Sequence, residues 1–439
     1  MARRARRSLW QVVAMSAATT LLASCANAPD QATVVAGSAP GLTSTQVSVG
    51  ALATMSGPIA ADFAPIVSGV RAYLAWTNAH GGVAGRQVVL THVADDGGSP
   101  SSNAVQARTL VQQDHVFAVV GVATAFFTGA SYLARTATPT FGYALQNEWS
   151  GPANLFAAYG SAIDFSTLGP QIAYLAHQVH SRSLALMAYD VPQSAGVCAA
   201  AKPALARLGL SIGYQDLSVP YGGDVSSDVL RMKQAGVDLV VSCMDVTGNV
   251  QLSRTMGQNG MTGESQLWLD GYNSSTLTSY APLMRNTYFV VQHVPFEAAT
   301  EMPGAFPGLG DYLAAMRRYA PRDVRSEVAM EGWLSAATFV AGLRAAGPHP
   351  TQASVVAAIN HLASFTGGGL MTPVNWRVAH TVITPPSCES FVRTATSRGG
   401  RPEFRVAFAH GSHIWICFPT TGPIDLDHPV APPAGSPGS

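Results

Sequence analysis

VSVGALATMSGPIAADF (residues 47–63) opens the stretch that decides the fold, and HVFAVVG (residues 115–121) closes it. Residues 47–52 form a short apolar run that breaks at Ser56-Gly57-Pro58, which is typical of a strand ending in a turn. Apolar residues then recur every three or four positions as far as Thr77, which predicts a helix with one buried face.

The rest of this stretch repeats the same pattern. Gly81-Gly82 ends the predicted helix, and a second strand is expected at residues 86–93. Ser99 and Pro100 are suited to begin a helix over 101–114, and residues 116–120 are a third strand. This β-α-β-α-β order is the unit of a parallel, doubly wound α/β sheet.

Four blocks within this stretch carry a family resemblance. VGALATMSGPIAADF, WTNAHGGVAGRQVVL, ADDGGSP and HVFAVVG follow one another in the order and spacing of the leucine/isoleucine/valine-binding proteins of bacterial ABC transporters. The chain therefore resembles a type I periplasmic solute-binding protein. The resemblance implies two doubly wound lobes with mainly parallel sheets, a three-strand hinge, and closure of the lobes on a ligand.

The beginning of the chain has the features of an export signal. Four arginines among the first seven residues precede an apolar segment at 9–23, and Leu22-Ala23-Ser24-Cys25 resembles a bacterial lipobox. We expect residues 1–24 to be removed and Cys25 to carry lipid, which would anchor the protein to the outer face of the cell membrane. The alternative is an ordinary secreted protein with a chance cysteine, and the export route, Sec or twin-arginine, stays open.

Composition excludes several classes of function. Removing residues 1–24 takes away four arginines and no acids, so the mature chain has 21 basic and 25 acidic residues and a charge of −4, which argues against nucleic-acid binding. The sequence has no nucleophile elbow, Walker loop, dinucleotide fingerprint or zinc-protease motif. We therefore expect no enzyme activity, no catalytic residues, no cofactor and no metal.

Four cysteines remain after Cys25, an even number in an exported chain, which favours two disulfides. Three pairings are possible, and buried free thiols are the alternative. We predict Cys198–Cys243 and Cys388–Cys417, because each pair lies within one predicted structural block.

The α/β alternation returns from residue 163 and is lost in the last hundred residues, where an antiparallel meander is expected at 391–418. The predicted parts are a flexible tether at 25–45, a first lobe at 46–160 and 292–375, a second lobe at 161–291 and 376–428, and a disordered tail at 429–439.

Ligands of parallel sheets bind beyond the carboxyl ends of the strands. Laid on the family's motifs, the ligand positions are Ala125, Ala144, Gln146 and Asp270, of which the aspartate would bind a cationic group; capping of the next turn is its alternative role. The predicted ligand-binding residues are Phe63, Thr124, Ala125, Phe126, Tyr143, Ala144, Gln146, Asp245, Asp270 and Tyr272.

Departures from the family pattern leave the ligand open. A family serine is replaced by Ala125, so its hydroxyl is lost unless Thr124 supplies one, and Asp62 stands where the family has an aromatic residue. Amino acids, amides, urea and small aliphatic or aromatic acids are all candidates. The resemblance implies a monomer that delivers its ligand to an ABC permease; the alternative is a ligand sensor of the same fold.

Overall fold

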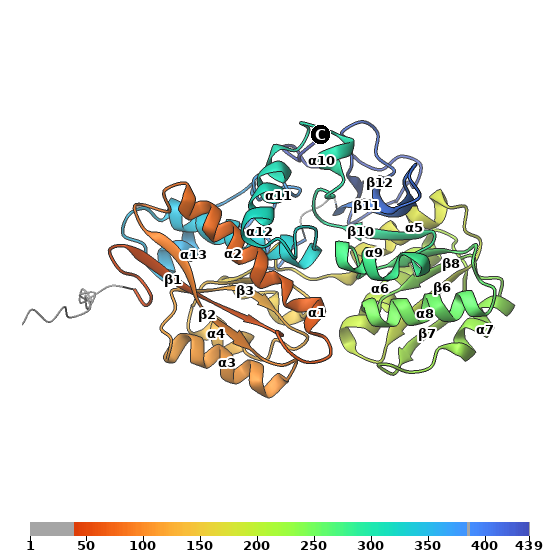
Figure 1. The fold of residues 1–439 in the computed structure, drawn as a ribbon, viewed down its shortest axis with the longest axis horizontal. Helices are drawn as coiled ribbons and strands as arrows, with labels where there is room; N and C mark the ends of the chain where they lie inside the picture. The colour runs from red at the N-terminus through yellow and green to blue at the C-terminus, as the bar shows by residue number, and fades with distance from the viewer. Residues whose placement is uncertain (1–38, 384–386, 439) are drawn as a thin grey trace, which may run out of the picture. The chain divides into compact units, whose positions relative to one another are not determined.

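Two mainly parallel sheets, each covered by helices on both faces, make up the fold (Figure 1). The computed structural model describes residues 39–383 and 387–438, so Cys25 and the predicted signal at 1–24 lie outside it. The first sheet has five parallel strands. In spatial order they are β2 (Gln87–Asp95), β1 (Gln46–Ala53), β3 (Ala118–Ala123), β4 (Thr140–Gly142) and β5 (Leu155–Ala157).

Helices from two separate parts of the chain cover this sheet. Those next to it in sequence are α1 (Ala60–Phe63), α2 (Pro65–Ala79), α3 (Pro100–Gln112), α4 (Ala130–Arg135) and the 3-10 turn η1 (Asn147–Trp149). Those that return later are α11 (Pro307–Tyr319), α12 (Glu327–Ala345) and α13 (Gln352–Asn360). The short helix α10 (Ala298–Glu301) precedes them and lies beside β12 of the second sheet, where Glu301 pairs with Arg405. The long apolar helix α12 packs against α2, so the late segment completes the first lobe.

Two glycines explain how closely α2 and α12 approach each other. A Cβ atom added to Gly69 would lie 1.8 Å from the backbone oxygen of Ala329, and one added to Gly332 would lie 2.0 Å from that of Ile66. Since no side chain fits at either position, the two backbones are in direct contact. This crossing holds the amino-terminal end of α12 against α1 and α2.

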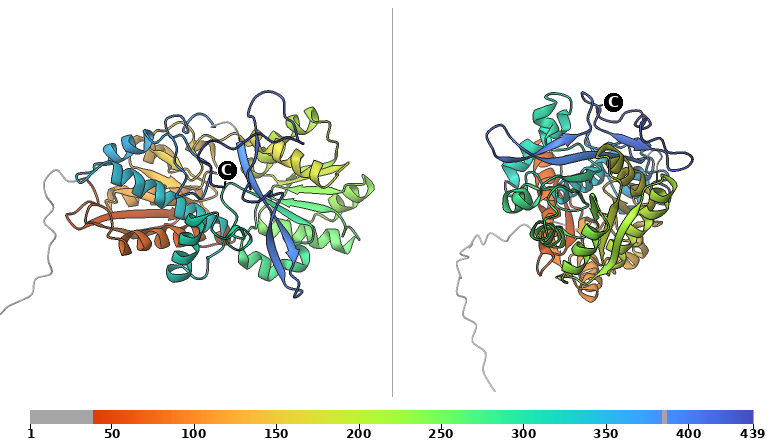
Figure 2. Two further views of the ribbon diagram at one scale, coloured as in Figure 1. Left: turned by 90° about the horizontal axis from the view of Figure 1, so that it is seen from above. Right: turned by 90° about the vertical axis from the view of Figure 1, so that its right-hand side faces the viewer.

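The second sheet has eight strands, seven of them in one continuous order, and an antiparallel edge. The seven are β12 (Pro402–Ala407), β11 (Ser387–Thr396), β10 (Thr287–Val291), β9 (Ser265–Trp268), β8 (Leu239–Ser242), β6 (Leu184–Tyr189) and β7 (Ile212–Val219); β13 (Ile416–Phe418) pairs with β11. β11 pairs antiparallel with β10, and β12 pairs antiparallel with β11, so these two strands, blue in Figure 2, form one edge of the sheet. The three late strands are not a simple meander, because β13 joins the start of β11 rather than β12.

The second sheet buries alternate residues of its strands on opposite faces. Leu184, Leu186 and Ala188 face one apolar cluster, and Ala185 and Met187 face the other. The covering helices are η2 (Phe165–Leu168), α5 (Gly169–Gln178), α6 (Pro192–Arg207), α7 (Ser226–Gln234), α8 (Val246–Gln258), α9 (Ser274–Tyr280) and η3 (Ala281–Leu283). Together the two sheets confirm the predicted fold class, two mainly parallel doubly wound α/β layers.

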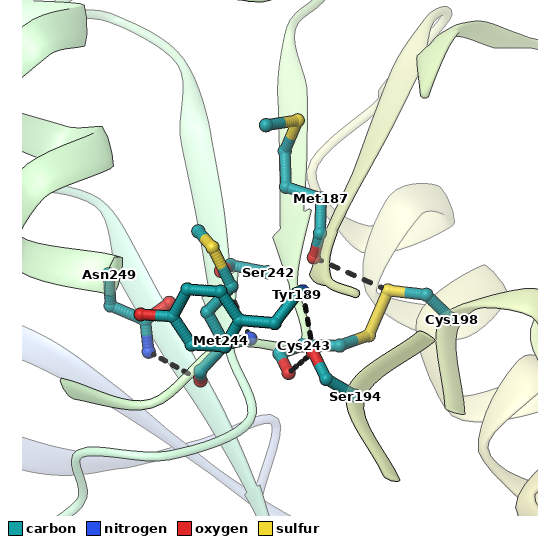
Figure 3. Close-up of a disulfide and its surroundings, with 8 residues drawn as sticks. All are labelled: Met187, Tyr189, Ser194, Cys198, Ser242, Cys243, Met244 and Asn249. Carbon is teal, nitrogen blue, oxygen red and sulfur yellow. Dashed lines mark hydrogen bonds between the residues drawn. A yellow bond between two sulfur atoms is a disulfide. The ribbon is translucent and has the colours of Figure 1, made fainter. Parts of the chain in front are cut away.

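Both predicted disulfides are present. Cys198 of α6 is bonded to Cys243, which directly follows β8 and is 45 positions later in the sequence. Cys388 and Cys417 face each other across the β11–β13 pair. Ser194 lies beside the first disulfide and donates a hydrogen bond to the backbone oxygen of Cys243 (Figure 3).

Three segment boundaries differ from those expected from sequence. Residues 376–383 pack on the first sheet rather than the second, since Trp376 contacts the Phe156 ring at 5.1 Å. Part of the expected tether is paired, with Leu42 opposite Val47. The expected disordered tail is also placed: Trp415 donates from Nε1 to the oxygen of Pro437 at 2.8 Å. The tether and the tail were expected from composition alone, which does not reveal these contacts with the folded part of the chain.

No helix among the described residues combines the length and the apolarity that crossing a membrane requires.

Candidate functional site

The carboxyl ends of β1, β2 and β3 are joined by one buried aspartate. Asp96 accepts hydrogen bonds from the hydroxyls of Thr54 at 2.7 Å and Thr124 at 2.5 Å, and from the side-chain amide of Asn103 at 2.9 Å. These bonds keep the loop ends of the first sheet together. They also use the Thr124 hydroxyl inside the lobe, which differs from our expectation that this hydroxyl serves a ligand.

The loop after β4 and the loop after β3 support each other. Gln146 is 5% exposed and donates from Nε2 to the Thr124 oxygen at 2.6 Å, while its Oε1 has no hydrogen-bond partner. Ala125 accepts a bond at 3.4 Å from Gln193, which belongs to α6 of the second lobe. The side chain of Phe126 is 39% exposed. This face of the first lobe therefore meets the second lobe.

Apolar groups line the first lobe beside these loops. Phe63 is buried in a cluster that also includes half-buried Ala125 and Tyr143. Ala144 is half-buried and packs on the neighbouring cluster around Trp149. The structure thus brings five of the predicted residues together on two adjacent loops and α1, with Thr124 and Gln146 acting as supports.

In the second lobe, Asp245 caps a helix at the end of β8. Its carboxylate accepts from the backbone N–H of Gly248 at 2.9 Å, at the start of α8, and from the Tyr189 hydroxyl at 2.9 Å. The ring of Tyr189 lies 5.1 Å from that of Tyr221, whose side chain is 52% exposed. Asp245 therefore has a clear structural role and still leaves its carboxylate half-buried at the loop end of the sheet.

Asp270 follows β9 and lies beside the beginning of α8. Its backbone oxygen accepts from the side chain of Asn249 at 3.0 Å, which fixes the loop. Burial raises the pKa of its carboxyl to about 7, and the charge of Asp245 adds to the shift. The surroundings of this carboxyl therefore disfavour its ionised form.

Asp62 brings a third carboxyl to the same place from the first lobe. Burial raises its pKa to about 8, with further contributions from the charges of Asp270 and Asp245. Asp62, Asp270 and Glu327 line one pocket, together with Arg322 and Arg325. From sequence, Asp62 stands out only as a departure from the family pattern, and it was not among the predicted ligand-binding residues.

The helix α12 supplies two more carboxyls. Glu327 and Glu331 are one helical turn apart, and burial raises the pKa of each well above its usual range. The charge of Asp270 acts on both. Two acids four positions apart at the start of an otherwise apolar helix are the signal that could have identified them. The prediction missed them because α12 comes from the later segment of the first lobe.

Tyr272 does not take part as predicted. Its side chain is 1% exposed, and its hydroxyl donates to Glu297 and accepts from the backbone N–H of Phe296 at 2.8 Å. Its ring packs against the rings of Phe289 and Phe404. Both parts of the Tyr272 side chain are therefore held within the protein: aromatic rings pack against its ring, and Glu297 and the Phe296 backbone bind its hydroxyl.

The carboxyls of this site lack basic partners. Within residues 39–383 and 387–438, no ion pair involves Asp62, Asp245, Asp270, Glu327 or Glu331. A larger pocket between α9 and β12 differs in this respect, because two of its acids are paired: Arg325 with Glu297 at 3.4 Å and Arg405 with Glu301 at 3.6 Å. The unpaired carboxyls are therefore the candidate ligand site.

Comparisons with known proteins agree with the fold. A family model described as periplasmic binding protein matches residues 46–394. A fatty acid ABC transporter substrate-binding protein from Thermomonospora curvata superposes with a TM-score of 0.69 at 17% identity, covering 84% of this chain and 93% of that one.

Two structures of branched-chain amino acid transporter proteins are similarly close. The protein from Thermus thermophilus with bound valine gives a TM-score of 0.67 at 18% identity, with 83% of this chain and 95% of that chain covered. LivJ from Streptococcus pneumoniae in complex with isoleucine gives 0.67 at 17% identity, with 83% and 99% covered. A search of curated protein sequences found no match. The match over residues 46–394 shows that the chain belongs to the periplasmic binding protein family, with the type I fold.

Proposed function

We propose that this protein is a lipid-anchored, extracytoplasmic solute-binding protein that captures a small ligand with a cationic group and delivers it to an ABC permease. One observation supports the choice of ligand: Asp62, Asp245 and Asp270 come from both lobes, the charge of Asp245 acts on Asp62 and Asp270, and none of the three forms an ion pair within the described residues. An ammonium or similar cation would supply the missing partner.

The mechanism follows from the cost of burying charge. Carboxyls that are buried without a counter-ion are driven toward the neutral form. A cation that enters between them favours their ionised form, and the resulting charged hydrogen bonds are stronger than neutral ones. Because Asp62 and Asp270 belong to different lobes, binding of the cation would favour the closed arrangement.

The same charges argue against a ligand that offers only a carboxylate. Placing an anion beside three carboxyls would raise the pKa values of Asp62 and Asp270 further, or the carboxylates would repel the ligand. Arg322 and Arg325 line the same pocket and could bind the anionic end of a zwitterion. Arg325 is also paired with Glu297. A simple fatty acid is therefore a poor fit, and an amine or amino acid is a better one.

Mass spectrometry of small molecules released by denaturing the purified protein tests this proposal. We expect a solute with at least one cationic group, chemically unaltered by incubation with the protein. A thermal-shift series with that solute should show saturable stabilisation, because a ligand that binds only the folded state raises the unfolding temperature. Recovery of only anionic solutes would contradict the choice of ligand.

The lipid anchor is tested separately through Cys25. Replacement of Cys25→Ser removes the thiol that would carry the lipid, so the protein should lose its membrane association. Membrane and soluble fractions of cells expressing both forms, probed for the protein, measure this. An unchanged membrane fraction would contradict anchoring at Cys25.

A further inference from the structure

The site holds more unpaired acid than one ammonium group needs. Glu331 is 3% exposed, and its Oε2 has no hydrogen-bond partner. Glu389 of β11 is 6% exposed; Gln292 donates to its Oε1 at 3.1 Å, but its Oε2 also lacks a partner. The Tyr159 hydroxyl is a third buried oxygen without a partner. Buried polar atoms in folded proteins are usually satisfied, so these three oxygens are positions where polar groups of a ligand would find hydrogen-bond partners.

These orphan oxygens belong to the same region as the aspartates. The charge of Asp270 acts on Glu327 and Glu331, and the charge of Glu389 acts on Glu327. Burial raises the pKa of the Tyr143 hydroxyl, and the charges of Glu331, Glu327, Asp270 and Asp62 raise it further. Tyr143 therefore lies near both the aspartates and the glutamates. The acids thus extend from the pocket at Asp62 and Asp270 toward the deeply buried Glu331.

Basic side chains do not compensate for this extension. Arg322 and Arg325 line the pocket beside Asp62, but the causes that shift Glu327, Glu331 and Glu389 include no lysine, arginine or histidine. A single ammonium beside Asp62 and Asp270 would leave Glu331 unpartnered. A second donor group with a positive charge would satisfy it.

We propose, on the basis of the function proposed above, that the natural ligand carries two cationic groups joined by an apolar spacer, as in a linear diamine. One ammonium lies between Asp62 and Asp270, and the other lies at Glu327 and Glu331. The spacer contacts the apolar atoms of Phe63 and Tyr143, which share one cluster with Val328 of α12.

Calorimetric titration of the full-length chain at pH 8 with three probes tests this inference: 1,4-diaminobutane, n-butylamine and valine. The diamine should bind at least tenfold more tightly than the monoamine of equal carbon number or the amino acid, because only the diamine meets both groups of acids. Glu331→Gln should reduce the diamine preference at least tenfold, since it removes one of the two carboxyls that hold the second ammonium and leaves Asp62 and Asp270 unchanged. Glu327→Gln is a second variant with the same expected direction.

The control is Glu148→Gln, the same chemical change at an exposed position outside the acid cluster, which should leave the preference unchanged. Circular dichroism of each variant establishes that it is folded. Equal or tighter binding of valine or n-butylamine would overturn the dication inference and leave a cation-binding solute receptor in place. Undiminished diamine preference in both folded glutamate variants would also overturn it. Failure of all three probes, together with release of only anionic solutes, would overturn this inference and the proposed cationic ligand together.

Discussion

Individual aspartates in this protein have opposite surroundings, and the difference separates support from function. Asp96 receives hydrogen bonds from three side chains and from the backbone N–H of Gly98. Asp62 and Asp270 are half-buried and form no ion pair among the described residues, and their pKa values are raised. A carboxylate with four donors stabilises the fold, whereas one without a counter-ion is available to a ligand.

Replacement of Asp96→Asn should destabilise the protein by about 2–4 kcal/mol, because an amide cannot accept every bond that the carboxylate accepts from its buried donors. Urea unfolding measures the loss. Asp311→Asn, at an exposed position of α11, is the matched control and should change stability by less than about 0.5 kcal/mol. Equal stability of the two variants would show that the Asp96 network contributes little.

Replacement of Asp62→Asn should change how stability depends on pH. The folded-state pKa of Asp62 is about 8, against an ordinary value of 3.8. Between these values the folded state binds more protons than the unfolded chain, so the contribution of Asp62 is present below about pH 4 and is lost as the pH rises to about 8. The difference in unfolding free energy between wild type and variant should therefore fall from pH 5 to pH 8 in the absence of ligand. A constant difference would mean that the pKa of Asp62 is not raised.

At the scale of elements, the crossing of α2 and α12 determines where the deep acids lie. Gly69 and Gly332 let the two backbones touch, and this contact places the start of α12, with Glu327, next to α1 and Asp62. The site therefore depends on a helix that is distant in sequence from the strands it serves.

Replacement of Gly332→Ala should destabilise the protein by about 1–3 kcal/mol, because the added methyl group meets the Ile66 backbone and the helices must separate. Gly310→Ala in α11 is the matched control: nothing lies within 4 Å of its added Cβ, so it should stabilise by about 0.4–1 kcal/mol through helix propensity. Thermal unfolding of both variants measures the effects. The same sign for both would contradict the close crossing.

Local sequence patterns predicted the elements and less of their assembly. The strands and helices of residues 47–121 were predicted correctly because they depend on hydrophobic spacing. Both disulfides were predicted correctly because each pair of cysteines lies within one structural block. The packing of Trp376 on the first lobe and the placed tail at 430–437 were not predicted, because each depends on contacts between segments distant in sequence.

The candidate site shows the same division. Asp245 and Asp270 could be proposed as ligand residues from sequence because they directly follow strands, where the loops of a parallel sheet meet. Glu327 and Glu331 were missed because only tertiary packing brings α12 to those loops. Tyr272 was wrongly assigned, since its position after a strand does not reveal that Glu297 and the aromatic core hold its side chain.

At the scale of the whole molecule, the two lobes meet at a cluster of carboxyls that stays unpaired among the described residues. This arrangement stores an electrostatic cost that a cation from outside can relieve. Binding of a cation should therefore be linked to loss of protons from these carboxyls. In the ligand-bound state, Asp62 of the first lobe and Asp270 of the second lobe should both contact the cation.

Calorimetric titration with n-butylamine, in wild type and in the variant Asp270→Asn at pH 6 and pH 8, examines this link. Binding to wild type should strengthen with pH as Asp270, with a pKa of about 7, and Asp62, with a pKa of about 8, lose their protons. The variant should bind about 10- to 100-fold more weakly at pH 8, the scale of one charged hydrogen bond, and its pH dependence should be smaller. Equal affinity at both pH values, unchanged in the variant, would contradict cation binding by these carboxyls.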